Sequence, residues 1–276
     1  LAWHSNYQEL LPRSAMINLV RRLFENKYWR FIKYWNFVGV SKNTRQKWKS
    51  IFHLLVFSPI ERYDFWEYIT GKRIDFSRGF LLGEHATPEE RRKIRSHLAK
   101  QVKYQGRKRL IMKFTGPARI EYLTSIFPDA IFVSIAREPI ATVRSWLEVG
   151  FWQRQGINRL WWIGAYTPEE EAEAEKLKAD PALITAFQYK KLMETTQLEI
   201  EKLKVPILET RYEAFVQDPV ALVKKILDFV QLPASKYVDA YVQEMVVSNR
   251  NTRASKKTSF SEETQKRILE IAAPFS

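Results

Sequence analysis

The sequence predicts an α/β protein: a mostly parallel central sheet flanked by helices, with a helix-rich insertion in its N-terminal part. Short apolar segments alternate with helix-start signals in the order strand, helix, strand, helix over residues 110–147. The joints between them are short, which is typical of parallel strands linked by helical crossovers. The chain has 276 residues, of which 45% are hydrophobic. We therefore expect a single domain over residues 1–276 with a substantial core.

Strands are expected at LIMKF (110–114), AIFVSIA (130–136) and VPILET (205–210), and the second of these should be buried. Helix starts are marked by a capping residue followed by proline in the first turn. Such starts occur at Thr87, Thr167, Asp180 and Asp218. Further helices are expected over residues 118–127, 138–149 and 261–271, and residues 12–104 should be mainly helical.

The charge of the chain indicates an anionic partner. Lys and Arg number 45 against 31 Asp and Glu, a net charge of +14. Such a surplus favours a nucleotide, a nucleic acid, an acidic glycan or a membrane surface without choosing among them. There is no cysteine, which excludes disulfides, thiol catalysis and cysteine-ligated metal, and favours a reducing cytoplasm. The sequence contains no apolar run of about 18 residues, so it does not predict a membrane-spanning helix.

Arg137 stands where the strand 130–136 ends and a helix begins. Ligands of open α/β sheets lie beyond the carboxyl ends of the strands, and the next helix should offer N–H groups to an anion. A guanidinium is a planar fork of donors suited to phosphate, and Ser145 adds a hydroxyl from the same helix. The alternative is an ion pair between Arg137 and a neighbouring carboxylate, with Ser145 a small packing residue.

The segment REPIATVRS resembles the 3′-phosphate-binding segment of the sulfotransferases that use 3′-phosphoadenosine 5′-phosphosulfate (PAPS). The resemblance implies a P-loop NTPase-like sulfotransferase fold, with Arg137 and Ser145 holding the 3′-phosphate. The stretch RYEAFVQDPVALVKKILDFVQLP (211–233) is similar to a second family segment, which would place Tyr212 near the adenine. Tyr212 can equally be an ordinary half-buried tyrosine.

A basic stretch near the C-terminus resembles the loop that covers the 3′-phosphate in this family. Its candidate residues are Arg250, Arg253, Lys256 and Lys257, and the alternative for each is a solvated charge. The family's loop for the 5′-phosphosulfate has no counterpart in this sequence. We expect the chain to begin after that loop, missing roughly 30–40 residues that include the first strand. The alternative is a sulfotransferase-like protein that has lost catalysis.

The resemblance also implies the catalytic groups. Lys113, at the end of strand 110–114, corresponds to a lysine that contacts the sulfonate or the leaving group. Thr115 stands where cytosolic members of the family often carry a histidine that serves as the catalytic base. A threonine cannot act as a base at neutral pH. Glu61 is our first candidate for the base and His85 the second. Their alternatives are a helix cap and a structural or solvated histidine.

Aromatic residues are the candidates for the acceptor site. Phe151, Trp152, Trp161 and Trp162 follow the Arg137 helix and could stack on a sugar or an aromatic ring, or could be core. The stretch KYWRFIKYW (27–35) mixes cations and aromatics at helical spacing. It could contact a membrane surface near a lipid acceptor, form a lid over the acceptor, or be an ordinary amphipathic helix.

These features together predict sulfuryl transfer from PAPS, as co-substrate and without a metal, to a hydroxyl of a glycan, lipid or small-molecule acceptor. A catalytically inactive adenosine-phosphate-binding scaffold is one alternative. A basic nucleic-acid-binding protein is another, but it rests on charge alone. A P-loop kinase is disfavoured because the G-x-x-x-x-G-K-[ST] pattern is absent. The sequence does not indicate the oligomeric state.

Overall fold

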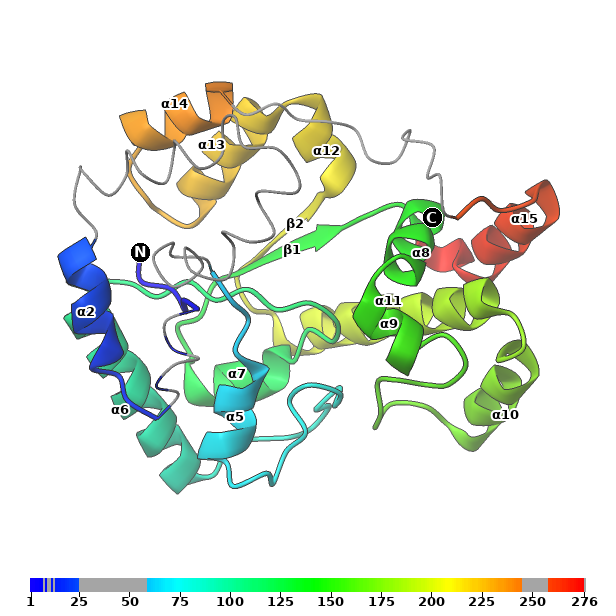
Figure 1. Cartoon of the computed structure of the whole chain (residues 1–276), viewed down its shortest axis with the longest axis horizontal. Helices are drawn as coiled ribbons and strands as arrows, with labels where there is room; N and C mark the ends of the chain where they lie inside the picture. Colours follow the sequence, from blue (N-terminus) through cyan, green and yellow to red (C-terminus); the bar gives the residue numbers. More distant parts are fainter. Residues whose placement is uncertain (7, 9–10, 12, 25–58, 245–257, 276) are drawn as a thin grey trace, which may run out of the picture. The chain divides into compact units, whose positions relative to one another are not determined.

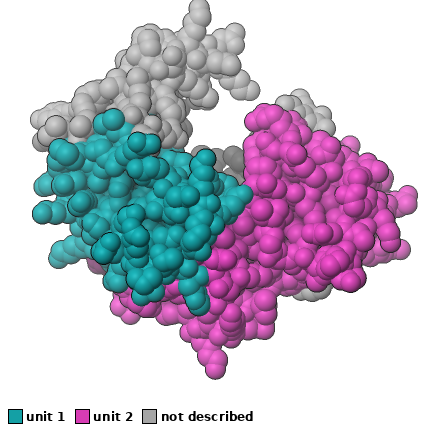
Figure 2. All heavy atoms as spheres, turned by 90° about the horizontal axis from the view of Figure 1, so that it is seen from below, with its two compact units in different colours: residues 1–77, 85–115 teal, residues 78–84, 116–276 magenta. Residues whose placement is uncertain are grey.

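The computed structural model describes residues 1–6, 8, 11, 13–24, 59–244 and 258–275 (Figure 1). These residues form two compact units, coloured separately in Figure 2. Unit 1 comprises residues 1–77 and 85–115, and unit 2 comprises residues 78–84 and 116–276. The predicted stretch 27–35 lies outside the described residues.

The secondary-structure elements described in unit 1 are three helices, and a mainly helical character over residues 12–104 stays a prediction. The helices are α2 (Ile17–Phe24), α5 (Tyr63–Ile69) and α6 (Pro88–Tyr104). The start of α6 is confirmed. The Thr87 hydroxyl accepts from the Glu90 backbone N–H at 3.2 Å, and the Glu90 carboxylate accepts from the Thr87 N–H at 2.9 Å. This reciprocal capping box satisfies two N–H groups that the first turn cannot bond internally.

The prediction of a strand over residues 110–114 is wrong. The segment makes one isolated parallel bridge, between Ala2 and Leu110, and Ile111 is 50% exposed. The Ala2 N–H donates to the Arg109 carbonyl, and the Ile111 N–H donates to the Ala2 carbonyl. An apolar run becomes a strand only where another segment pairs with it, and here the partner is a single residue.

Unit 2 contains the sheet and most of the helices (Figure 1). In chain order its elements are α7 (Ile120–Ile126), β1 (Phe132–Ala136), α8 (Pro139–Leu147), α9 (Gly150–Gln155), α10 (Pro168–Leu177), α11 (Pro181–Leu203), β2 (Ile207–Arg211), α12 (Tyr212–Gln217), α13 (Pro219–Phe229), α14 (Lys236–Glu244), α15 (Glu262–Ile271) and the 3-10 turn Ala273–Phe275. The predicted starts at Thr167, Asp180 and Asp218 are confirmed, since each side chain accepts from a backbone N–H of the following helix.

Strands β1 and β2 pair in parallel, with Phe132 opposite Ile207 and Ala136 opposite Arg211. The mixed α/β class with a parallel sheet is therefore confirmed. The expectation that the first of these strands is buried is wrong, because its residues are half-buried and Ile135 is 62% exposed. Successive strand side chains point to opposite faces of a sheet, so Ile135 shares its face with Val133, which is half-buried. This face is therefore only partly covered.

Helix α11 is the central helix of the apolar core in unit 2. It packs against α8 and α15, where Val143, Leu183 and Ile268 form a buried apolar cluster. A second cluster joins Phe80 and Leu192 to Trp152 and Trp162. The packing on α11 holds α8 in place, and so holds the turn through which the chain passes from β1 to this helix.

Candidate functional site

Arg137 and Tyr212 each directly follow one of the two paired strands, at the carboxyl end of the sheet. Because Ala136 is paired with Arg211, the next residue on each strand emerges at the carboxyl end of the parallel pair. The guanidinium carbon of Arg137 lies 4.7 Å from the centre of the Tyr212 ring. This is a cation–π contact, and it joins the two residues that the sequence predicts for the phosphate and the adenine.

Tyr189 of α11 fixes the backbone at Arg137. Its hydroxyl donates to the Arg137 carbonyl at 3.0 Å. Burial raises the pKa of Tyr189 to about 12, so the hydroxyl remains protonated and able to donate at neutral pH. On the other side, the N–H of Glu138 donates to the Glu213 carboxylate at 3.1 Å. These two contacts hold the turn between β1 and α8 from both α11 and α12.

The beginning of α8 does not offer the N–H groups that the sequence predicts for an anion. The Glu138 carboxylate accepts from the N–H groups of Ile140 and Ala141 at 2.9 and 2.8 Å, and Pro139 has no N–H. The expectation of free donors here is therefore wrong. The helix start is already neutralised by its own N-cap carboxylate, which leaves the Arg137 side chain as the phosphate-binding candidate.

Ser145 lies on α8, half-buried, two turns after Arg137. Its hydroxyl makes no hydrogen bond to another residue of the described part of the chain, and its role as a phosphate ligand stays a prediction. The other predicted cofactor ligands, Arg250, Arg253, Lys256 and Lys257, lie outside the described residues.

In unit 1, a second group of polar side chains surrounds Glu61. Lys113 Nζ lies 2.7 Å from Glu61 Oε1, in an ion pair whose lysine side chain is 75% exposed. The Tyr63 hydroxyl donates to Glu61 Oε2 at 2.5 Å, and the Thr115 hydroxyl donates to the same oxygen at 2.8 Å. The Thr115 N–H in turn donates to the Tyr63 oxygen at 2.9 Å. The predicted base and the predicted lysine are thus in direct contact.

This environment keeps Glu61 ionised. Burial acts to raise its pKa, but hydrogen bonds from Lys113, Tyr63 and Thr115 outweigh burial and lower the pKa below its ordinary value of 4.5. Burial, followed by the hydrogen bond to Glu61, raises the pKa of Tyr63 to about 12. At neutral pH, Glu61 is therefore a carboxylate that can accept a proton, and Tyr63 is a neutral donor that orients it.

His85, the second candidate for the base, is not among the partners of Glu61. It is exposed in the loop before α6, and its carbonyl accepts from Arg73 at 3.1 Å. Thr115 does not take the role of general base that a histidine could have at this position. It donates to the carboxylate rather than accepting a proton, so it positions Glu61.

The four aromatic acceptor candidates divide into two pairs. Trp152 and Trp162 are 1% and 6% exposed and pack with Phe80, and the Trp152 indole N–H donates to Thr185 at 2.9 Å. These two are in the core, the alternative that the sequence leaves open. Phe151 is 43% exposed, and its ring lies 5.5 Å from that of Trp161. Phe151 and Trp161 remain candidates for an acceptor wall.

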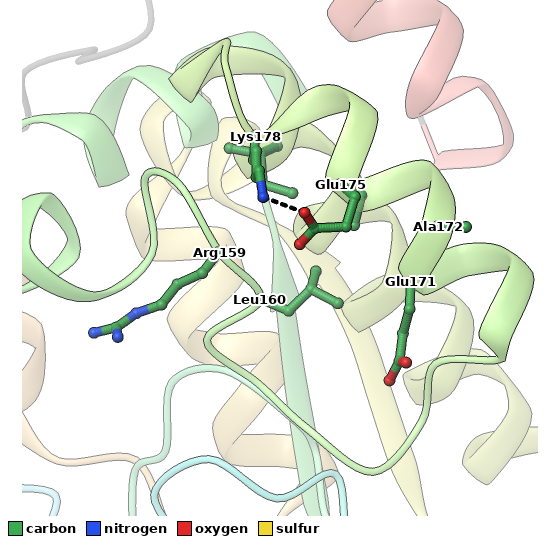
Figure 3. Close-up of a pocket in the computed structure, with 8 residues that line it drawn as sticks. Arg159, Leu160, Glu171, Ala172, Glu175 and Lys178 are labelled. Carbon is green, nitrogen blue, oxygen red and sulfur yellow. Dashed lines mark hydrogen bonds and ion pairs between the residues drawn. The ribbon is translucent and has the colours of Figure 1, made fainter.

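A pocket of about 310 Å³ lies in unit 2 between α10, the start of α11 and the loop before α10 (Figure 3). Leu160, Ala174 and Ile184 give it an apolar lining, and Lys178 is paired with Glu175 on its rim. None of its lining residues was predicted to act in the site. Three or more His, Asp or Glu residues that could hold a metal ion do not come together anywhere in the described ranges.

The geometry defines an α/β protein with an arginine and an aromatic ring at the carboxyl edge of parallel strands, the position where such folds bind ligands. A model of the sulfotransferase family matches residues 81–236. The chain belongs to this family, and it is therefore a transferase that needs a sulfate donor and an acceptor. No curated protein and no solved structure matches the chain.

Three residues that contact the candidate groups in the two units were not predicted from the sequence: Tyr63, Tyr189 and Glu138. The two tyrosines act on residues 52 positions away, Thr115 and Arg137, and no local pattern reports such contacts. Glu138 did carry a signal, because an acidic residue directly before the proline of a helix start stands at the N-cap.

Proposed function

We propose that the chain transfers a sulfuryl group from PAPS to a hydroxyl of a glycan, lipid or small-molecule acceptor. The observation that carries the proposal is the contact between Arg137 and Tyr212 at the ends of β1 and β2. Arg137 offers paired N–H donors for the 3′-phosphate, and the Tyr212 ring offers a face for the adenine. Membership of the sulfotransferase family supports this choice of donor over other nucleotides.

In the proposed reaction, a bond forms between the acceptor oxygen and sulfur while the bond between sulfur and the phosphate oxygen breaks. The hydroxyl proton passes to the Glu61 carboxylate, which the contacts of unit 1 hold ionised. Such general-base assistance is typically worth about 10²–10⁴-fold in rate. Lys113 carries the positive charge that stabilises the sulfonate or the leaving phosphate, as the family resemblance implies. A well-placed donor of this kind contributes about 3–4 kcal/mol to the transition state.

Two measurements on the same preparation test the proposal. Titration with the desulfated product, adenosine 3′,5′-bisphosphate, should raise the melting temperature, and Arg137→Ala should reduce the rise at the same ligand concentration. Transfer of labelled sulfate from PAPS to a panel of hydroxyl acceptors should then be detected and should be lost in Glu61→Gln. Bisphosphate binding without transfer would instead indicate an adenosine-phosphate-binding scaffold. Absence of bisphosphate binding by the wild-type chain would overturn the assignment of Arg137 and Tyr212.

A further inference from the structure

The outer surface of α6 carries an unbalanced positive charge. Glu90, Ile94, Leu98 and Gln101 form the buried side of the helix at a spacing of three to four residues. The remaining positions are exposed or half-buried and include six exposed cations, of which Lys93 is paired with Glu89. The other five, with one cation of the turn that follows the helix, together form what we call the α6 cationic face. Its members are Arg91, Arg92, Arg95, Lys100, Lys103 and, in the turn that follows, Lys108.

The acidic residues of the helix do not neutralise this face. Glu89 is paired with Lys93 at 2.8 Å, and the buried Glu90 is paired with Arg73 at 2.7 Å. Within the described ranges, none of the six cations of the α6 cationic face takes part in an ion pair. Six like charges on one helix and its turn repel one another, and an anionic partner relieves that repulsion.

Exposed apolar side chains lie on and next to α2, the helix that packs at the C-terminal end of α6. Helix α2 packs against α6 (Figure 1), and the Asn18 side chain accepts from Gln105 at 2.6 Å. On either side of Asn18, Met16 is 62% exposed and Leu19 is 39% exposed. Cations with aliphatic side chains next to them suit the interface of an anionic bilayer, where headgroups meet the cations and the acyl boundary accepts the apolar groups.

We propose that the α6 cationic face, with Met16 and Leu19, docks unit 1 onto an anionic lipid surface. The inference does not depend on the proposed function, because none of these residues belongs to the candidate site. It selects a lipid surface over a nucleic acid, since a phosphate backbone takes the cations but gives Met16 and Leu19 nothing to contact. A cation near an anionic membrane contributes roughly a fivefold gain in binding.

The test is cosedimentation of the full chain with vesicles of phosphatidylcholine alone and of phosphatidylcholine mixed with phosphatidylglycerol. The wild-type chain should bind the anionic vesicles and not the neutral ones. The triple variant Arg92→Glu, Arg95→Glu and Lys103→Glu should bind roughly 100-fold more weakly. The matched control, Lys224→Glu, Lys225→Glu and Arg267→Glu, changes the net charge equally at exposed positions of α13 and α15, and should bind as wild type.

A second pair of substitutions, Met16→Ser with Leu19→Ser, separates lipid from other polyanions. It should weaken vesicle binding roughly tenfold and leave binding to duplex DNA unchanged. Melting temperatures close to that of wild type establish that the variants are folded. If the triple glutamate variant is not folded, the triple glutamine variant Arg92→Gln, Arg95→Gln and Lys103→Gln takes its place. Equal binding by the two charge-reversed triples would overturn the proposal. Equal binding of wild type to neutral and anionic vesicles, or no effect of the serine pair on vesicle binding, would do so as well.

Discussion

The guanidinium of Arg137 lies 4.7 Å from the ring centre of Tyr212, although the two residues are far apart in the chain. The parallel register of β1 and β2 produces this contact, because each residue directly follows the last paired position of its strand. The side chain of Arg137 thus rests on an aromatic face while its backbone carbonyl is held by Tyr189. A guanidinium restrained in this way loses less conformational freedom when it binds a phosphate.

Arg137→Ala should weaken binding of adenosine 3′,5′-bisphosphate by roughly 10–100-fold, the range expected for losing charged hydrogen bonds. Arg137→Lys should fall between alanine and wild type, because lysine keeps the charge but loses the planar fork. Isothermal titration calorimetry measures both. Arg267→Ala removes an exposed arginine from α15 and is the matched control. Wild-type affinity in Arg137→Ala would rule out the phosphate role.

Tyr189→Phe should lower both stability and bisphosphate affinity. It removes the hydrogen bond to the Arg137 carbonyl and should reduce the free energy of unfolding by about 1 kcal/mol. For a chain of this size, that corresponds to a fall in melting temperature of roughly 2–4 °C. Tyr241→Phe, at a tyrosine that is 63% exposed, should change neither quantity. If both variants behave alike, Tyr189 does not position Arg137.

Glu61→Gln should lower kcat by about 10²–10⁴-fold, the usual contribution of a general base, and leave bisphosphate affinity unchanged. The neutral amide cannot take the acceptor's proton. Glu263→Gln, on the exposed first turn of α15, is the matched control. Loss of bisphosphate binding together with kcat would assign Glu61 a structural role instead.

Tyr63→Phe should move the acid limb of the kcat profile to higher pH. The tyrosine hydroxyl helps to lower the pKa of Glu61, so removing it raises that pKa and Glu61 becomes protonated at a higher pH. Activity should consequently begin to fall at a higher pH than in wild type. A pH–rate series measures the shift, and an unchanged acid limb would mean that Glu61 is not the group that titrates.

Acid should destabilise unit 1 through the buried His4 and the half-buried His97. Burial, with a contribution from Arg62, lowers the pKa of His4 to about 3 and that of His97 to about 4. The unfolded chain binds these protons near pH 6.5, so stability is greatest above that value and is lost as the pH falls toward the folded pKa values. Between about pH 7 and pH 5 the loss should be on the order of 2–4 kcal/mol.

Urea unfolding at each pH measures this effect. The slope of unfolding free energy against pH should decrease in His97→Gln, whatever the absolute stability of that variant. His85→Gln, at an exposed histidine, should leave the slope unchanged. Equal slopes in wild type and His97→Gln would contradict the assignment.

The sequence predicts helix starts well because their chemistry is local. Thr87 with Glu90, and Thr167 with Glu170, form reciprocal caps within four residues, and the structure contains both. A strand depends on a partner elsewhere in the chain. Segment 110–114 has the composition of a strand, yet Leu110 meets only Ala2, and the segment does not become one.

The same distinction explains the site. Arg137 could be predicted because its position after a strand and before a proline is a short pattern. Tyr189 could not, because it reaches Arg137 from a helix 52 residues away. The pairing of Glu61 with Lys113 likewise joins residues from separate parts of the chain. Each was a separate candidate in the sequence, and only the fold reveals that they touch.

The separation of β1 from β2 has a consequence for synthesis of the protein. The two strands are offset by 75 residues, so β1 leaves the ribosome with its hydrogen-bonding edge open until β2 follows. At ordinary translation rates this interval lasts roughly 4–15 seconds. An open strand edge is prone to intermolecular pairing. Nascent chains halted before residue 207 should therefore aggregate more readily than chains released after β2.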